Sequence, residues 1–416
     1  MTDLPPFQPL PDHVRDKARQ ELVEGLDRKP PAWRGPLTIA ATVAALAAGA
    51  VVTGQAIWSP GTTPLATPPT SGPPQFQGLD MTELYDIKRS FAPPGMAERC
   101  AAAKPENPPV AQWRPVLSVF SNGVTIAAFE VPAGRIFCTT TATTAAVSAP
   151  VRQELGGAPA RILFAAPNGA IAGLVPPGVR HLGVNRSLPV GNHTIVSGGH
   201  AAVVDSLFLV PGGFSRAGDP SSFLIDGDEV PIADVPAVTP PVVDRPQPPA
   251  ERTSEAGQRL QACLADQQFA VPDRDQFVAG AHVKFSEQSE VQLGRFGDLL
   301  LQCRYQAGQE LMMLVQDHVG AGEGQRYNTI SAEWYYFDFR ADENGSSSSD
   351  KRAIVGQVLD QRATSITATA PGLPEQSAVI SNGTYVLPGP VPPDTTAKIT
   401  VKDASGAVLE EISLRE

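Results

Sequence analysis

Hydrophobic and polar residues alternate in two sets of four predicted strands after residue 79, as half-exposed antiparallel sheets require. Turns rich in Gly, Asn, Asp and Ser separate these runs. Two stretches are alike: "GAIAGLVPPGVRHLGVNRSLP" at 169–189 and "RAIVGQVLDQRATSITATAPG" at 352–372. Each has Ala-Ile-(Ala/Val)-Gly, then a loop, then alternating apolar residues. The pattern predicts that one structural unit occurs twice in the chain.

The order of the predicted elements supports the repeat. In the first unit a helical stretch carries Cys100, and the strand "GRIFCTTTAT" carries Cys138. In the second unit the helix "SEAGQRLQACLADQ", with Ser254 as its N-cap, carries Cys263, and the strand "DLLLQCRYQ" carries Cys303. We therefore expect an α+β protein with two repeated modules, each a helix joined by a disulfide to a mainly antiparallel sheet.

Four cysteines allow three disulfide pairings. The repeat favours Cys100–Cys138 and Cys263–Cys303, since these pairs would then be equivalent. Disulfides persist outside the reducing cytoplasm, so this pairing indicates an oxidising compartment. A zinc site is not indicated, because the chain has no C-x-x-C and no histidine close to a cysteine.

Residues 37–58, "LTIAATVAALAAGAVVTGQAIW", carry no charge and match the length of about 20 residues that crosses a bilayer. Trp33 and Trp58 stand at the two ends of this segment, where the membrane interface favours aromatic rings. The basic residues before it are Arg15, Lys17, Arg19, Arg28, Lys29 and Arg34. We expect a single-pass protein of type II topology in the cell membrane, with a cytoplasmic N-terminus and an extracellular C-terminal region. A cleaved signal peptide and a buried core helix are the alternatives.

The remaining boundaries follow from composition. Residues 1–36 form a predicted cytoplasmic tail, and residues 59–78 and 235–252 are Pro-rich linkers. The modules are then 79–234 and 253–416. In the tail an amphipathic helix presents one apolar face, formed by Val14, Ala18, Leu22 and Leu26. This helix would lie on the membrane or bind a cytoplasmic partner.

The chain has 416 residues and a formal net charge of −11, which argues against nucleic-acid binding because phosphates must be neutralised by Lys and Arg. Its aromatic run "EWYYFDFR" at 333–340 predicts a central core strand, with a ligand-facing aromatic strip as the alternative.

Candidate catalytic groups gather in the first unit: His181, His193, His200, Asp205, Ser197 and Ser206. A Ser-His-Asp arrangement can be drawn from them, but no G-x-S-x-G surrounds these serines. The second unit has no matching histidines, so polar loop histidines are the simpler interpretation. Phosphate-binding glycine motifs are also missing from the sequence. We therefore assign no catalytic, cofactor-binding or metal-ligating residue.

The stretch "DHVRDKARQELVEGLDRKPPAWRGPLTIAATVAALAAG", with its Ala, Pro and Arg usage, resembles uncharacterised single-pass membrane proteins of actinobacteria. The plan of inner tail, span and outer domain also resembles transmembrane anti-sigma factors. The chain departs from that family, since it lacks H-x-x-x-C-x-x-C and its tail of residues 1–36 is shorter than the usual sigma-binding domain.

These observations favour a membrane-anchored extracytoplasmic binding or sensing protein without catalytic activity, whose modules contact an envelope protein or peptide. One alternative is a transmembrane regulator, similar to an anti-sigma factor, whose tail holds a cytoplasmic protein. A further alternative is an extracellular hydrolase.

Overall fold

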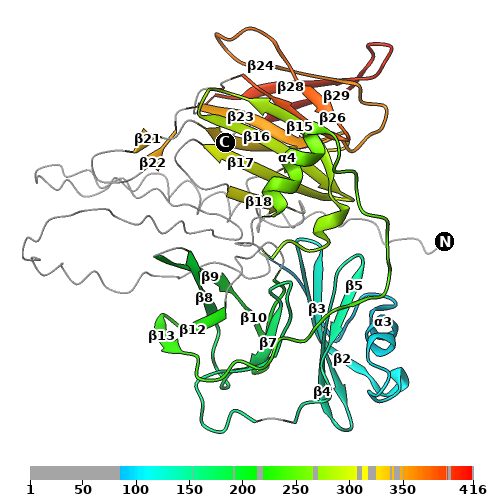
Figure 1. Cartoon of the computed structure of the whole chain (residues 1–416), viewed down its shortest axis with the longest axis vertical. Helices are drawn as coiled ribbons and strands as arrows, with labels where there is room; N and C mark the ends of the chain where they lie inside the picture. Colours follow the sequence, from blue (N-terminus) through cyan, green and yellow to red (C-terminus); the bar gives the residue numbers. More distant parts are fainter. Residues whose placement is uncertain are drawn as a thin grey trace, which may run out of the picture. The chain divides into compact units, whose positions relative to one another are not determined.

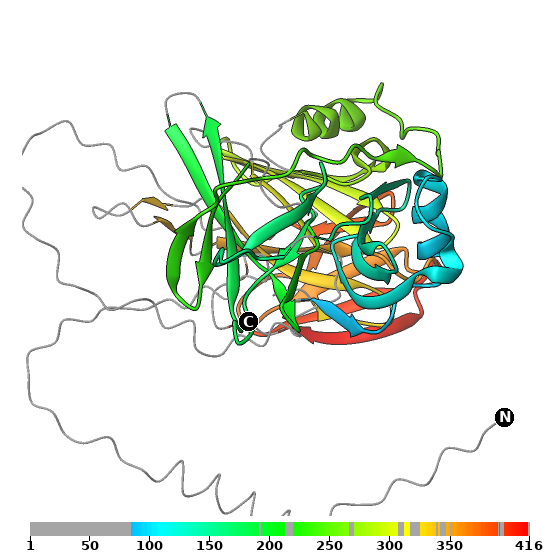
Figure 2. The same cartoon turned by 90° about the horizontal axis from the view of Figure 1, so that it is seen from below.

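The computed structural model describes residues 85–152, 154–190, 193–212, 219–265, 270–306, 312–316, 325–337, 340–341, 347–349, 351–389, 391 and 395–414. Antiparallel sheets dominate these residues, which include only two α-helices (Figures 1 and 2). We call residues 85–245 the first half and residues 250–414 the second half.

The first half holds one short helix and three antiparallel sheets. The sheets have the strand orders β1-β2-β3-β4-β5-β14, β10-β11-β7-β6 and β13-β12-β8-β9. The elements are β1 (Asp86–Arg89), α3 (Met96–Ala103), η1 (Val110–Gln112), β2 (Arg114–Ser121), β3 (Val124–Val131), β4 (Gly134–Thr140), β5 (Thr144–Val147), β6 (Arg161–Ala165), β7 (Ile171–Leu174), β8 (Leu182–Val190), β9 (His193–His200), β10 (Ala202–Val204), β11 (Leu207–Val210), β12 (Asp219–Ile225), β13 (Asp228–Pro231) and β14 (Val242–Val243).

The second half has the strand orders β15-β16-β17-β18, β19-β20-β23-β27-β26 and β25-β24-β28-β29, with a separate β21-β22 ribbon. Its elements are α4 (Glu255–Leu264), η2 (Arg274–Gln276), β15 (Val278–Lys284), β16 (Ser289–Phe296), β17 (Leu299–Gln306), β18 (Met312–Gln316), β19 (Gln325–Arg326), β20 (Ser331–Phe337), β21 (Arg340–Ala341), β22 (Ser347–Ser348), β23 (Lys351–Gln357), β24 (Ser365–Thr369), β25 (Gln376–Ser377), β26 (Val379–Ser381), β27 (Thr384–Leu387), β28 (Ala397–Lys402) and β29 (Val408–Leu414).

The two halves share one plan. In each, a helix precedes a short 3₁₀ turn and an up-and-down meander of four strands. The second sheet of the first half, β10-β11-β7-β6, has its counterpart in β26-β27-β23-β20. The third sheet, β13-β12-β8-β9, has its counterpart in β29-β28-β24-β25. Apart from the added edge strands β1, β14 and β19, the strand order is the same in all three sheets, so the chain contains two copies of one β-rich arrangement.

Hydrophobic cores lie between successive layers in each half. In the second half one core joins the meander to the middle sheet, and another joins the middle sheet to the third sheet. The first half has the same two cores. The middle strands are therefore buried on both faces, and β7 has no exposed residue. The aromatic run is the middle strand β20, in which Trp334 faces one core and Tyr335 and Phe337 face the other.

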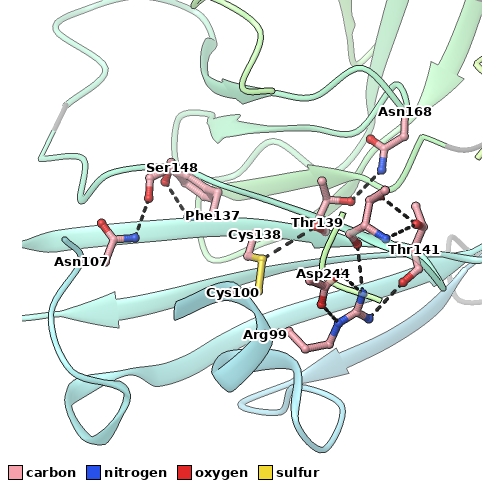
Figure 3. Close-up of a disulfide and its surroundings, with 11 residues drawn as sticks. Arg99, Cys100, Asn107, Phe137, Cys138, Thr139, Thr141, Ser148, Asn168 and Asp244 are labelled. Atoms are coloured by element: carbon pink, nitrogen blue, oxygen red, sulfur yellow. Dashed lines mark hydrogen bonds and ion pairs between the residues drawn. A yellow bond between two sulfur atoms is a disulfide. The ribbon is translucent and has the colours of Figure 1, made fainter. Parts of the chain in front are cut away.

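Each helix lies on the outer face of its meander and is joined to it by a disulfide. Cys100 is bonded to Cys138 of β4, and Cys263 is bonded to Cys303 of β17. These are the two pairs that the sequence favoured. Around each bond a small core forms between helix and sheet, and Figure 3 shows the first of the two disulfides with its surroundings.

The Pro-rich segment 235–252 is bound along the first half. Val242 and Val243 form β14 and pair with β5. Arg99 of α3 then donates hydrogen bonds from Nε and Nη2 to the two carboxylate oxygens of Asp244, at 2.6 and 2.8 Å (Figure 3). The same guanidinium also donates to the carbonyl oxygen of Thr141. This segment was expected to be an extended linker, and the structure adds that it completes a sheet of the first half.

Helix α4 begins at a dense capping arrangement. The Ser254 hydroxyl accepts a hydrogen bond from the Gly257 N–H at 3.0 Å, as expected for an N-cap. The Glu251 carboxylate accepts from the Thr253 hydroxyl at 2.7 Å and from the Ser254 N–H at 2.6 Å. These hydrogen bonds from Thr253 and Ser254 lower the pKa of Glu251 from 4.5 to about 2.

A pH titration tests this cap. The folded-state pKa of Glu251 lies below its ordinary value, so its stabilisation of the helix start is present above pH 4.5 and is lost as the pH falls toward about 2. We expect the carboxyl ¹³C resonance of Glu251 to titrate near pH 2, and Thr253→Val to move that midpoint upward. A Glu251 midpoint near 4.5 in the unmodified protein would contradict the arrangement.

Two expectations from the sequence are wrong. The class is mainly β rather than α+β, and each repeat contains three sheets rather than one helix with one sheet. The single-pass membrane protein of type II topology is not supported either. Within the residues that the structure describes, no helix is long and apolar enough to cross a membrane. Residues 37–58, on which that expectation was based, lie outside the described residues, as do the tail residues Val14, Ala18, Leu22 and Leu26.

Candidate functional site

A pocket of about 560 Å³ opens in the first half, where five chain segments meet. They are the β3–β4 turn, the segment after β5, strand β6, the end of β7 and the β10–β11 turn. Leu155, Leu163 and Leu174 give the pocket apolar walls. The pocket thus lies where the meander and the middle sheet end beside each other.

Backbone contacts fix the wall between β4 and the segment after β5. The backbone groups of Arg135 and Val151 exchange two hydrogen bonds, at 2.9 and 2.7 Å. Gly134 has a φ of +137°, and a Cβ there would lie 2.5 Å from the carbonyl oxygen of Val151. Arg152 donates from Nε and Nη2 to the carbonyl oxygens of the β3–β4 turn, at 2.7 and 2.8 Å. Much of the Arg152 side chain therefore serves to close the wall.

The β10–β11 turn forms another wall with an unusual residue choice. Asp205 and Ser206 both have positive φ, 48° and 65°. Three other hairpin turns in the described chain have the same backbone with glycine second: Asn122-Gly123, Asp226-Gly227 and Asn382-Gly383. A serine in the left-handed region costs roughly 1–2 kcal/mol relative to the right-handed region. The turn is held by the Val175 N–H, which donates to the Ser206 carbonyl oxygen at 3.0 Å.

Charged groups of both signs line the pocket, and carboxylates are in excess. Glu130, Glu154 and Asp205 stand against Arg135 and Arg152. Outside the pocket lining, Arg114 forms an ion pair with Glu130. The hydrogen bond from Arg114 is the largest cause that holds the pKa of Glu130 below its ordinary value. The lining as a whole has a formal charge of −1.

The strand registers identify the counterpart of this place in the second half. Phe208 of β11 lies opposite Gly173 of β7. Tyr385 of β27 lies opposite Gly356 of β23 in the same way. The counterpart positions, first half first, are Val175 and Val358, Asp205 and Asn382, and Ser206 and Gly383.

The meanders give the remaining correspondence. Glu130 ends β3 and Arg295 ends β16, and each stands eight positions before the cysteine of the next strand, Cys138 or Cys303. The first half therefore places a carboxylate where the second half places a guanidinium.

Arg295 occupies the counterpart place in the second half. Its Nη1 donates to the carbonyl oxygens of Val358 and Gly383, at 3.0 and 3.2 Å. Its Nε donates to the Gly297 carbonyl oxygen at 2.9 Å. Gly383 has a φ of +72°, and a Cβ there would lie 2.2 Å from Nη1 of Arg295, so glycine lets the guanidinium approach the turn in this position. The chain's own guanidinium lies in this place, whereas Glu130 pairs with Arg114 and leaves the first-half pocket open.

The candidate catalytic residues do not come together at the pocket. Its lining, all within the described part of the chain, contains Asp205 and Ser206 but no histidine. His200 ends β9, where burial and then the nearby charge of His181 lower its pKa. The side chains of His193 and Ser197 lie outside the described residues. A Ser-His-Asp arrangement is therefore not assembled at this pocket.

Sequence reasoning missed the pocket, although one signal was present. When the repeats are aligned on their second cysteines, Glu130 falls opposite Arg295. Such a charge reversal marks an equivalent position at which the side chains of the two halves make different contacts. Comparisons of the chain with models of protein families, with curated proteins and with solved structures found no match.

Proposed function

We propose that this chain is a non-enzymatic binding or sensing protein of an oxidising compartment, and that its ligand occupies the first-half pocket. The observation that carries the proposal is the contrast between the two halves: the same place is open in one and filled by Arg295 in the other. Walls held by backbone hydrogen bonds and lined by apolar and charged groups are typical of ligand sites.

Two further observations support the proposal. Both disulfides link helices to sheets, and such bonds persist in extracytoplasmic compartments. Ser206 in the pocket has no histidine beside it among the lining residues, so the groups present suit binding better than acyl transfer. A pocket of this size suits a small compound, a peptide side chain or a segment of an envelope protein.

Filling the pocket tests the function. The purified full chain would be dialysed against an extract of secreted and envelope compounds, and the retained compounds identified by mass spectrometry. We expect Leu155→Trp, which places an indole in the pocket, to reduce retention at least tenfold. Val243→Trp on the exposed strand β14 serves as the matched control and should retain the compounds. Equal retention by wild type and Leu155→Trp, or no retained compound at all, would contradict the proposal.

A further inference from the structure

The second half indicates which chemical group suits this place in the fold. There, one guanidinium nitrogen lies between the carbonyl oxygens of residues 358 and 383. Both acceptors are backbone carbonyl oxygens, so the strand arrangement determines their positions and the identity of the side chains does not. The carbonyl group of Val175 is the counterpart of the Val358 carbonyl. The same backbone hydrogen bond joins the strand end to the turn in both halves: the Val175 N–H donates to the Ser206 oxygen at 3.0 Å, and the Val358 N–H donates to the Gly383 oxygen at 2.9 Å.

Charge in the first half favours a cation from outside. Replacing an arginine by Glu130 removes the internal cation and adds a carboxylate at the same position. Glu154 and Asp205 add two more carboxylates to the lining. Arg114 already pairs with Glu130, and the guanidinium of Arg152 is directed to backbone carbonyls. Arg135, which lies opposite Glu130 in the β3–β4 ladder, is then the remaining lining cation against the carboxylates of Glu154 and Asp205.

The apolar walls set the second requirement for a ligand. Leu155, Leu163 and Leu174 would contact a hydrocarbon stem, as apolar surfaces contact the stems of Lys and Arg side chains. Ser206 has a side chain where its counterpart Gly383 has none. A cation in the first half therefore lies farther from this turn than Arg295 does, beside the Ser206 hydroxyl rather than against the backbone.

We propose that the first-half pocket binds a guanidinium or primary ammonium group on an aliphatic stem, the chemistry of an arginine or lysine side chain. An external cation thereby takes the role that Arg295 has in the second half. This inference rests on the proposed function, because it names the ligand class of the same pocket. An anionic ligand held by Arg135 is disfavoured, because the carboxylates of Glu154 and Asp205 line the same pocket.

Four probes separate these possibilities by calorimetric titration of the full, oxidised chain. Butylguanidinium is the free cation, butylurea its neutral counterpart and butyrate the anion. Acetyl-Ala-Arg-Ala-amide presents the same cation on a peptide. We expect both cationic probes to bind at least tenfold more tightly than butylurea and butyrate, and the tighter of the two identifies the source as a free compound or a peptide.

Variants locate the site. Asp205→Asn should weaken butylguanidinium binding at least fivefold, while Asp228→Asn in the exposed β12–β13 hairpin, outside the lining, should leave it unchanged. The double variant Glu130→Arg with Ser206→Gly reproduces the pair found in the second half and should abolish binding. Asp205→Asn keeps the test valid if that double variant fails to fold.

The outcomes distinguish this inference from the proposed function. If butyrate or butylurea binds as tightly as butylguanidinium, and Leu155→Trp removes that binding, the pocket is a ligand site but the cation assignment is wrong. If no probe binds while the dialysis experiment yields a retained compound that depends on the pocket, the ligand class is again wrong. If neither experiment gives binding that depends on Leu155, both proposals fail.

Discussion

Replacing Cys263 and Cys303 together by alanine is expected to lower the free energy of unfolding of the second half by about 4 kcal/mol. The bond joins residues that are 40 positions apart, and closing a loop of this length restricts the unfolded chain by about that amount in the chain-entropy model. The folded state also loses the covalent bond between α4 and the meander, so that the packing of Leu260 and Leu264 must hold the helix in place. Urea unfolding followed by hydrogen exchange of the second half measures the loss.

The first disulfide provides a matched comparison. Cys100 and Cys138 are 38 positions apart, so the entropic loss in a Cys100→Ala, Cys138→Ala variant should be nearly equal. In the first half, however, the Arg99–Asp244 pair still connects α3 to the residue that follows β14. We therefore expect α3 to keep more protection from exchange than α4 does in the corresponding variant. A loss below about 1 kcal/mol in both variants would contradict a structural role for the two bonds.

The repeat was readable from the sequence for a physical reason. The phrases that revealed it contain all of the middle strand β7 (Ile171–Leu174) and all but the first residue of the middle strand β23 (Lys351–Gln357). A strand buried on both faces has little freedom to change, and at Gly173 and Gly356 a Cβ would lie about 2 Å from a carbonyl oxygen of the neighbouring strand. These constraints keep the two copies alike where surface strands diverge.

The fold class could not be derived in the same way. Alternation marks a strand but does not say which sheet it joins. Here β7 pairs with β11 and β8 pairs with β12, so the middle and third sheets both depend on contacts between distant segments. The cysteine-bearing helices attracted attention in the sequence, yet they span only 8 and 10 residues.

Composition alone does not show what segment 235–252 contacts. Its prolines keep it extended, and an extended chain can pair with a sheet edge wherever an N–H and a carbonyl remain available. Val242 and Val243 do so with β5, and Asp244 fixes the position through Arg99. The partner residue, Arg99, lies far away in the sequence, so no local pattern could reveal the contact.

The candidate site also depends on contacts between residues that are distant in the sequence, so local patterns did not reveal it. Asp205 and Ser206 were noticed as parts of a possible catalytic group, and the structure places them in a pocket wall without a histidine. The feature that distinguishes the pocket from its counterpart in the second half is Glu130 at the position that Arg295 occupies there. That contrast gains meaning only through the strand registers, which place both residues beside equivalent turns.

Arg352→Ala is the other change for which we expect a large effect, a loss of roughly 3–5 kcal/mol in the stability of the second half. Arg352 lies in the middle strand β23 and is 0% exposed. Its guanidinium lies 4.0 Å from the centre of the Trp334 ring, and its Nε donates to the Val391 carbonyl oxygen at 3.2 Å. Alanine would leave a cavity beside Trp334 and remove the donor from that buried carbonyl.

Three further variants separate the causes of this loss. Arg352→Met keeps most of the volume without the hydrogen bonds, so its stability should lie between those of wild type and Arg352→Ala. Arg352→Lys keeps a charge but lacks the planar group that stacks on Trp334, and we expect it to lose nearly as much as alanine. Arg362→Ala removes an exposed arginine paired with Asp360 and should leave the stability almost unchanged, because solvent screens such a surface pair. Equal stability of Arg352→Ala and Arg362→Ala in urea would mean that the buried guanidinium does not help to hold the middle and third sheets together.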